Sequence, residues 1–483
     1  MITDLNFFDI GAKWPPDSEM ERLQRYDQNR KLFEGRHELV FKDWVRLLRD
    51  DKKATLEIIL NWHKRLSTLW ADLLLGERPR ITAGEANSKE QQQLEAIIEN
   101  NDFFNVAYEV ALDISRYGTG LFKLRYDGRA IIEAIPPSLW FPVVSADNIK
   151  DVQAHIIAWT FDVATPTAFN KDKKTTYLRL EIHEKGKITN RLFELKDGVI
   201  KQELDITSFY NDIEAEQQTG IDDFLVVPVH NILTSDRVYG QDDYSDLDSI
   251  IQELEIRVAQ ISRILDKHAD PHMAGPSTAL EQNEYGEYVF RGGSKYFPLE
   301  QGDPEPKYIT WDGQLEAAFR EIDLLMEQLY VLSETSAAAF GQLKSGLAES
   351  GTALRRLMMT PLAKVNRIRM RLDPAVKKVL KLASQLEAKY GKGVELRTIN
   401  IAWADGLPQD DKEQTEIWTM RVQNGLASRE TALKNLYEYD AETLREELMK
   451  IASENEKTSL FNIDLGKILP TQNPEQTQQA GNE

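Results

Sequence analysis

The chain has 483 residues and no cysteine, which excludes disulfides, thiolate metal sites and cysteine nucleophiles. Hydrophobic residues make up 41%, enough for real cores, and the length predicts more than one lobe. Its 59 basic and 79 acidic residues give a formal net charge of −20, which disfavours DNA wrapping by phosphate neutralisation. We expect neither a signal peptide nor a membrane span, because no basic-then-apolar start and no long apolar run occur, and therefore a cytosolic origin.

The first quarter of the chain predicts helices. One helix should begin at Asp17 or Ser18 and end at Gly35. A longer helix is predicted over 55–75, where leucine, isoleucine and tryptophan recur at helical spacing before Gly76. Two further helices are expected over 88–99 and 103–116.

From Gly118 the pattern changes to short alternating runs separated by Gly, Pro, Asp and Asn. Asp197-Gly198 between two such runs predicts a hairpin. We expect an antiparallel β region of about a hundred residues. The runs are LFKLRYDG, RAIIEAIPP, LWFPVV, AHIIAWTFDV, TYLRLEIHEKG, ITNRLFELKDG and VIKQEL.

Two heptad stripes predict two amphipathic rods, each about 30 Å long at 1.5 Å per residue. Between the rods, 268–313 is rich in Pro, Gly and Tyr, and only YVF and KYFPL there suggest strands. Narrow stripes bury little in one chain, so side-by-side repetition in a ring would cover the remaining faces. The stripes are Leu247, Ile251, Leu254, Val258, Ile261 and Leu265, and Leu315, Phe319, Ile322, Met326, Leu329 and Ser333.

The remainder begins with a small-residue stretch around Gly341, Gly346 and Gly351, typical of a mobile loop. A long helix over 350–390 should be kinked at Pro361 and at Pro374. A strand, VELRTINIAW, follows, and then a helical segment over 410–456 that is split near Asn424-Gly425, with Ser428 starting its second helix. The tail, 461–483, is expected to be disordered.

No catalytic, cofactor or metal site is expected. His268 and His272 are four apart, but Pro271 between them breaks the helix that would align them. In DDYSDLDS, at 242–249, Leu247 occupies the glycine position of a calcium loop, so a capped helix start is the better interpretation. Gly118-Thr119-Gly120 lacks the third glycine of a dinucleotide fingerprint, and no P-loop occurs. The alternatives left open are a metal-dependent nuclease and a monomeric or dimeric coiled-coil adaptor.

The order of these elements resembles the portal (head–tail connector) proteins of tailed bacteriophages. Each motif alone is weak, but they occur in the same order over about four hundred residues. The motifs are NRKLFEG at 29–35, LLLGERPRI at 73–81, YGTGLFKLRYDG at 117–128, IIEAIPPSLWFPVVSADN at 131–148, HADPHMAG at 268–275, SGTALRRLM at 350–358, INIAWADGLPQDDKE at 399–413 and VQNGLASRETALKNL at 422–436.

The resemblance implies a mixed α+β, mainly helical fold of portal architecture, assembled as a ring of twelve subunits around a channel. The implied parts are a wing (1–243), stem helix 1 (244–266), a clip (267–312), stem helix 2 (313–333), a tunnel-loop region (334–350), the long kinked helix and return strand of the wing (351–404), a crown (405–460) and the tail (461–483).

The implied function is to package, retain and eject double-stranded DNA at a capsid vertex of the virion, after assembly in the host cytoplasm. Implied partners are other copies of the chain, double-stranded DNA that passes through the channel without sequence specificity, terminase, head-completion or adaptor proteins, and capsid and scaffolding proteins, with no membrane. Channel-lining candidates on the second rod are Glu316 and Asp323. Those in the loop are Gln342, Leu343, Lys344, Ser345, Gly346, Leu347, Ala348, Glu349 and Ser350. Lys344 either touches phosphates or pairs with Glu349.

Overall fold

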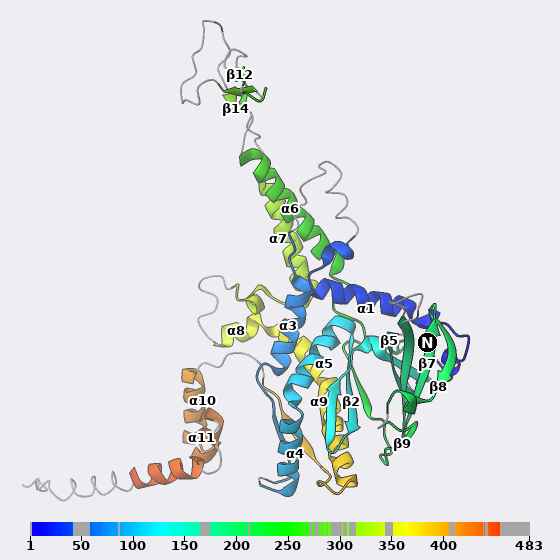
Figure 1. Cartoon of the computed structure of the whole chain (residues 1–483). Helices are drawn as coiled ribbons and strands as arrows, with labels where there is room; N and C mark the ends of the chain where they lie inside the picture. The colour runs from blue at the N-terminus through cyan, green and yellow to red at the C-terminus, as the bar shows by residue number, and fades with distance from the viewer. Residues whose placement is uncertain are drawn as a thin grey trace, which may run out of the picture. The chain divides into compact units, whose positions relative to one another are not determined.

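The computed structural model is a mixed α+β structure, mainly helical, which confirms the expected class (Figure 1). Contacts divide the chain into one unit of Met1–Lys344 with Arg356–Gly406, and a second of Ser345–Arg355 with Leu407–Glu483. Within the described part, no helix combines the length and apolar character of a membrane span. The described residues are 2–41, 58–85, 87–164, 174–210, 213–269, 273–274, 280–282, 284–286, 288–290, 302, 307–308, 315–342, 351–404, 411–437, 439 and 443–454.

The N-terminal arm lies against the large sheet before the first helix begins. Ile2 pairs with Val143 and Lys13 with Val199 as isolated bridges. The expected start at Asp17 or Ser18 is a short 3-10 turn, and helix α1 follows over Met20–Phe33. Gly35 then takes a φ of +80°, which ends the helix as expected. Two further 3-10 turns are η1 (Asn6–Phe8) and η3 (His37–Leu39).

Helix α3 (Trp62–Leu75) begins later than the predicted residue 55, since 58–61 are not helical. The cause is local: the Asn61 side chain accepts a hydrogen bond from the Lys64 backbone N–H at 3.0 Å and caps the helix there. Residues 55–57 lie outside the described residues. The next two helices, α4 (Lys89–Asn100) and α5 (Phe103–Tyr117), match their predicted positions.

The β region is antiparallel, as predicted, and forms two main sheets. The smaller sheet has the order β10-β2-β3, and the larger the order β4-β5-β6-β7-β8, with β9 pairing with β7. Asp197 and Gly198 both have positive φ, the backbone of a type I′ hairpin turn between β7 and β8. The strands are β2 (Thr119–Tyr126), β3 (Ala130–Ala134), β4 (Trp140–Val144), β5 (Val152–Ala164), β6 (Lys174–Glu184), β7 (Lys187–Lys196), β8 (Val199–Leu204), β9 (Glu216–Gln218) and β10 (Val226–His230).

Two long helices form the predicted rods and lie side by side (Figure 1). The first rod is α6 (Asp248–Ala269) and the second is α7 (Leu315–Leu332), each within four residues of its predicted ends. Between them are β11 (Met273–Ala274), β12 (Leu280–Gln282), β13 (Tyr288–Phe290) and β14 (Lys307–Tyr308). The YVF strand is therefore confirmed as β13, whereas KYFPL, at 295–299, lies outside the described residues.

Only part of each stripe is buried in the chain itself. Leu247, Ile251 and Leu254 of the first stripe pack with Leu329 of the second in one cluster, together with Leu32, Phe41, Leu66 and Tyr244. Leu265 and Phe319, by contrast, are each 51% exposed. The body of the first unit therefore covers part of the heptad stripes and leaves part open to solvent.

The predicted single helix over 350–390 is two helices, α8 (Gly351–Leu357) and α9 (Met359–Lys389). Pro361 lies in the first turn of α9, where a missing N–H costs little, so the chain breaks at Met358 instead of bending at Pro361. Pro374 lies inside α9 as expected. The predicted return strand is β15 (Ile399–Ala402), which pairs with β1 (Arg80–Ala83).

The second unit contains α10 (Asp411–Gln423), α11 (Arg429–Tyr437) and a helical segment over 443–454. The predicted split is confirmed, because Gly425 takes a φ of +70° after α10. Ser428 begins α11 as expected, since its hydroxyl accepts the Thr431 backbone N–H at 3.0 Å. The tail, 461–483, lies outside the described residues.

Candidate functional site

The site is built where the chain leaves the body to form the first rod. Gly118, which follows α5 with a φ of +76°, crosses the backbone of Gly240. A Cβ added to Gly240 would lie 1.9 Å from the Gly118 carbonyl oxygen. The Asn231 backbone N–H donates to that same oxygen at 2.8 Å. The paired glycines therefore bring the segment before the rod against the end of α5, a structural role for the Gly-Thr-Gly motif.

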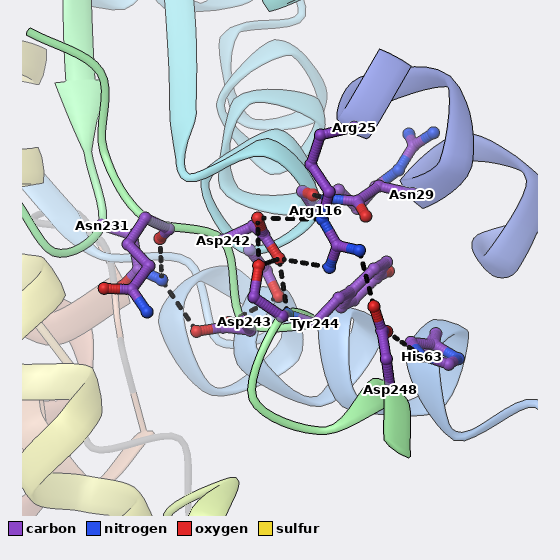
Figure 2. Close-up of polar contacts among 12 residues, drawn as sticks. Arg25, Asn29, His63, Arg116, Asn231, Asp242, Asp243, Tyr244 and Asp248 are labelled. Atoms are coloured by element: carbon purple, nitrogen blue, oxygen red, sulfur yellow. Dashed lines mark hydrogen bonds and ion pairs between the residues drawn. The ribbon is translucent and has the colours of Figure 1, made fainter. Parts of the chain in front are cut away.

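Asp242 caps the turn that leads into the rod (Figure 2). Its carboxylate accepts the backbone N–H groups of Tyr244 at 2.9 Å and Ser245 at 2.8 Å. Arg25 of α1 donates to the same carboxylate at 3.1 Å. The capped start predicted for DDYSDLDS is thus present, although the regular helix begins only at Asp248.

Asp243 joins the same segment to α5 and to the long helix α9. It accepts hydrogen bonds from Ser115 at 2.7 Å, Asn231 at 2.7 Å and Lys364 at 2.9 Å. The side chains of Lys364 and Asp243 are only 4% and 6% exposed. Loss of one partner of such a buried pair typically costs about 3–5 kcal/mol, so this contact fixes the position of the rod firmly.

Tyr244 completes a set of three consecutive residues, Asp242, Asp243 and Tyr244, that we call the junction residues. Its ring is fully buried, and its hydroxyl contacts Ser67 of α3 at 2.8 Å. Burial raises the pKa of Tyr244 well above its ordinary value, so the hydroxyl stays neutral. The three side chains thus reach different helices of the body.

One turn further along, Asp248 lies between the side chains of Arg25 and His63 (Figure 2). Arg25 donates to one carboxylate oxygen, and His63 contacts the other at 3.0 Å. Burial alone would raise the pKa of Asp248, but the hydrogen bond with His63 and the charge of Arg25 lower it overall. Burial lowers the pKa of His63 although Asp248 opposes this, so the neutral ring donates its Nε2–H.

A second buried contact ties the first rod to the N-terminal segment. His37 Nδ1 lies 2.6 Å from a carboxylate oxygen of Glu255, and His37 Nε2 lies 3.0 Å from the Leu32 carbonyl oxygen. The His37 ring is therefore held between the first rod and the end of α1. Leu60 also donates its backbone N–H to Glu255 at 2.9 Å.

The predicted channel-lining residues are only partly described. Gln342 accepts a hydrogen bond from the Tyr330 hydroxyl at 3.0 Å. Glu316 is exposed and pairs with Arg320 one turn on at 2.7 Å, and Asp323 is exposed as well. Leu343, Lys344, Ser345, Gly346, Leu347, Ala348, Glu349 and Ser350 lie outside the described residues. Whether any of these residues lines a channel remains a prediction.

Within the part of the chain that the structure describes, no group of three or more His, Cys, Asp or Glu could hold a metal ion. His272 lies outside the described residues. Sequence reasoning missed Lys364, Arg25 and the role of Asp243. The available signal was that Lys364 shares a helix face with Pro361, Val365 and Ile368, a position at which a charge is buried and needs a partner.

The sequence matches the family described as phage portal protein, SPP1 Gp6-like, over residues 13–459. No curated protein matches significantly. Among solved structures, the neck of an empty GTA particle computed with C6 symmetry is similar at a TM-score of 0.40 and 11% identity, covering 82% of this chain and 94% of that one. The neck of a native GTA particle computed with C12 symmetry is similar at a TM-score of 0.37 and 14% identity, covering 82% and 93%.

Proposed function

Since the chain belongs to the SPP1 Gp6-like family of phage portal proteins, we propose that it is one subunit of a ring, of twelve copies, that forms a DNA channel at a capsid vertex. The family is one of structural proteins of the bacteriophage head–tail connector, so the nuclease alternative loses its support. The family match over 13–459 is the single observation that carries the proposal.

The surface of the rods supports the ring. Several large apolar side chains of the rods are half exposed or more in the single chain. Full burial of such a side chain is worth about 1.5–3 kcal/mol, so covering the exposed half is worth about 1 kcal/mol, and neighbouring copies would gain stability by packing there. These residues are Leu265 (51%), Phe319 (51%), Leu324 (56%), Val331 (63%) and Leu332 (50%).

The charge of the chain suits passage of DNA rather than its capture. A net charge of −20 per subunit gives a ring without a deep electrostatic trap for phosphates, so DNA could move in both directions. Two exposed acids on the second rod, Glu316 and Asp323, are candidates for the channel wall. Lys344 is the positive charge in the candidate loop, and it either contacts phosphates weakly or pairs with Glu349.

The partners follow from the same role. Terminase would dock during packaging, and head-completion or adaptor proteins would dock later at the segment between the rods, 267–312. Capsid and scaffolding proteins would surround the wing, 1–243. The protein would assemble in the host cytoplasm and remain in the virion.

Light scattering on the purified full-length chain tests the ring. A closed oligomer with the mass of about twelve chains supports the proposal. A mass of one or two chains would favour the coiled-coil adaptor instead. A parallel assay with double-stranded DNA and Mg²⁺ should show no cleavage by the same preparation, and cleavage that co-purifies with it would revive the nuclease alternative.

A further inference from the structure

A cavity of about 560 Å³ lies in the β region, away from the rods. Its lining includes Lys123 of β2 and three consecutive same-face residues of β6, Arg179, Glu181 and His183. Alternation along the strand sends Leu178, Leu180 and Ile182 into the apolar core on the opposite face. The floor of the cavity is therefore a row of buried polar side chains on the face of β6 opposite the apolar core.

Two cations share one buried carboxylate in this floor. Glu181 accepts from Lys123 Nζ at 2.8 Å and from Arg179 Nη2 at 3.2 Å. The side chains of Lys123 and Arg179 are each 9% exposed, and that of Glu181 is 13% exposed. Glu133 lies 3.8 Å from Lys123, but it is occupied by a closer hydrogen bond from Arg125 at 2.9 Å. Within the floor, Lys123 and Arg179 therefore meet one carboxylate, Glu181, while Arg125, Asp127 and Glu214 line the rest of the cavity.

Several hydrogen-bonding atoms in the floor have no partner within the described chain. Arg179 Nε and His183 Nδ1 are buried and make no hydrogen bond. His183 Nε2 lies 3.5 Å from Glu181 without the geometry of a hydrogen bond. An unpaired buried donor costs about 1–3 kcal/mol, so a ligand that accepts hydrogen bonds would be favoured here.

The walls of the cavity are held in place. Asn190 donates to the Glu214 carbonyl oxygen at 2.9 Å, and Lys389 of α9 donates to the Thr219 carbonyl oxygen at 2.6 Å. Tyr126 and Tyr390 stack at the cavity with ring centroids 3.8 Å apart. The space is thus preformed by contacts from β2, β7 and α9.

We propose that this cavity binds a small oxyanion, a phosphate or a carboxylate, through Arg179, Lys123 and His183. An apolar molecule or a bare cation would leave the buried Arg179 Nε–H unpaired, whereas an oxyanion can accept its hydrogen bond. This site is independent of the ring and of DNA passage.

The test is isothermal titration calorimetry on the assembled full-length protein, with inorganic phosphate and, separately, sodium acetate as probes at constant ionic strength. We expect one saturable site per subunit, and the tighter of the two probes identifies the source of the oxyanion. Arg179→Gln should weaken binding at least about tenfold, because a charged hydrogen bond is lost. The control is Arg191→Gln, since Arg191 lies on β7 outside the cavity lining and pairs with Glu203 at 2.7 Å.

His183→Phe provides a second variant that keeps an aromatic ring and removes the unpaired nitrogens. It too should weaken binding while circular dichroism shows an intact fold. Absence of saturable binding of both probes to the wild-type protein would overturn the proposal, leaving a cavity filled by water alone. Equal affinity in wild type, Arg179→Gln and His183→Phe would overturn it as well, by placing the anion elsewhere.

Discussion

The Arg367 guanidinium donates two hydrogen bonds to the carboxylate of Glu334, the residue that ends the second rod with a φ of +58°. The Thr335 backbone N–H donates to the Tyr330 carbonyl oxygen, and the Glu334 N–H donates to that of Val331, which is a Schellman motif. Glycine usually occupies this left-handed position. The pair with α9 therefore holds glutamate in a backbone conformation that its side chain alone disfavours.

Substitutions at Glu334 should separate strain from pairing. Glu334→Ala loses the ion pair and keeps the strained backbone, so it should cost about 1–2 kcal/mol of unfolding free energy, since both side chains are about a third exposed. Glu334→Gly loses the pair but relieves about 1 kcal/mol of strain and should be near neutral. Thermal denaturation should rank glycine above alanine. Equal stability of the two variants would show that the backbone carries no strain.

Gly240→Ala should be severely destabilising, by about 3 kcal/mol or more, because its Cβ would collide with the Gly118 carbonyl oxygen. The control is Gly128→Ala, which has a φ of +67° and open space around its Cβ. That change should cost only about 1 kcal/mol. Chemical denaturation of both variants measures the difference. Similar costs would mean that the backbone crossing relaxes readily and does not fix the first rod.

Acid should destabilise the β region through buried histidines. Burial lowers the pKa of His155 to about 3 and that of His230 to about 4. Below about pH 6.5 these histidines take up a proton in the unfolded state but not in the folded state. The free energy of unfolding is therefore highest above pH 6.5 and decreases as the pH falls toward the folded-state pKa values. At pH 5 each histidine should lower the free energy of unfolding by about 2 kcal/mol relative to its value at neutral pH.

His155→Gln should reduce the loss of unfolding free energy between pH 7 and pH 5, because glutamine does not titrate and its oxygen can still accept the Trp140 indole N–H. His230→Gln should do the same, and the double variant should combine both effects. Urea denaturation at the two pH values is the measurement. An unchanged pH dependence in both variants would place the acid sensitivity in other groups.

The exposed apolar surface of the second rod should be needed for assembly and not for folding. Leu324→Glu changes a side chain that is 56% exposed in the single chain, so secondary structure and subunit stability should be retained while the ring is lost. Glu327→Gln, an exposed change three residues on, is the matched control. Sedimentation velocity should find small species only for Leu324→Glu. Normal rings from that variant would remove this face from the interface.

The loop 342–350 should be needed for DNA passage but not for ring formation. Gly346→Arg adds bulk and charge and should block packaging of DNA, while the variant still forms rings. Gly346→Ala, a small change at the same position, is the control. The yield of nuclease-protected DNA measures packaging. A normal yield from Gly346→Arg would exclude the loop from the mechanism.

The sequence predicts features that depend on local pattern. The Asp197-Gly198 hairpin, the heptad rods and the Ser428 cap are each specified by residues close together in the chain, and all three are present. The predicted start of α3 at residue 55 was wrong, because Asn61 caps the helix. The prediction of one continuous helix over 350–390 was also wrong, because the chain breaks at Met358, before Pro361.

The junction could not be predicted, because its contacts join residues far apart in sequence. Asp243 pairs with Lys364 across 121 positions, and Arg25 reaches Asp248 across 223. Pairings at such separations follow from the tertiary fold, not from spacing. The channel-facing residues of the rods depend on rotation about the rod axis, so Glu316 and Asp323 remain predictions.

The most direct test of the central claim is electron microscopy of the purified protein in negative stain. Class averages should show closed rings with a central opening and about twelve subunits. Compact single particles, with no ring at any protein concentration, would contradict the account, because the exposed apolar faces of the two rods would then be stable without neighbours.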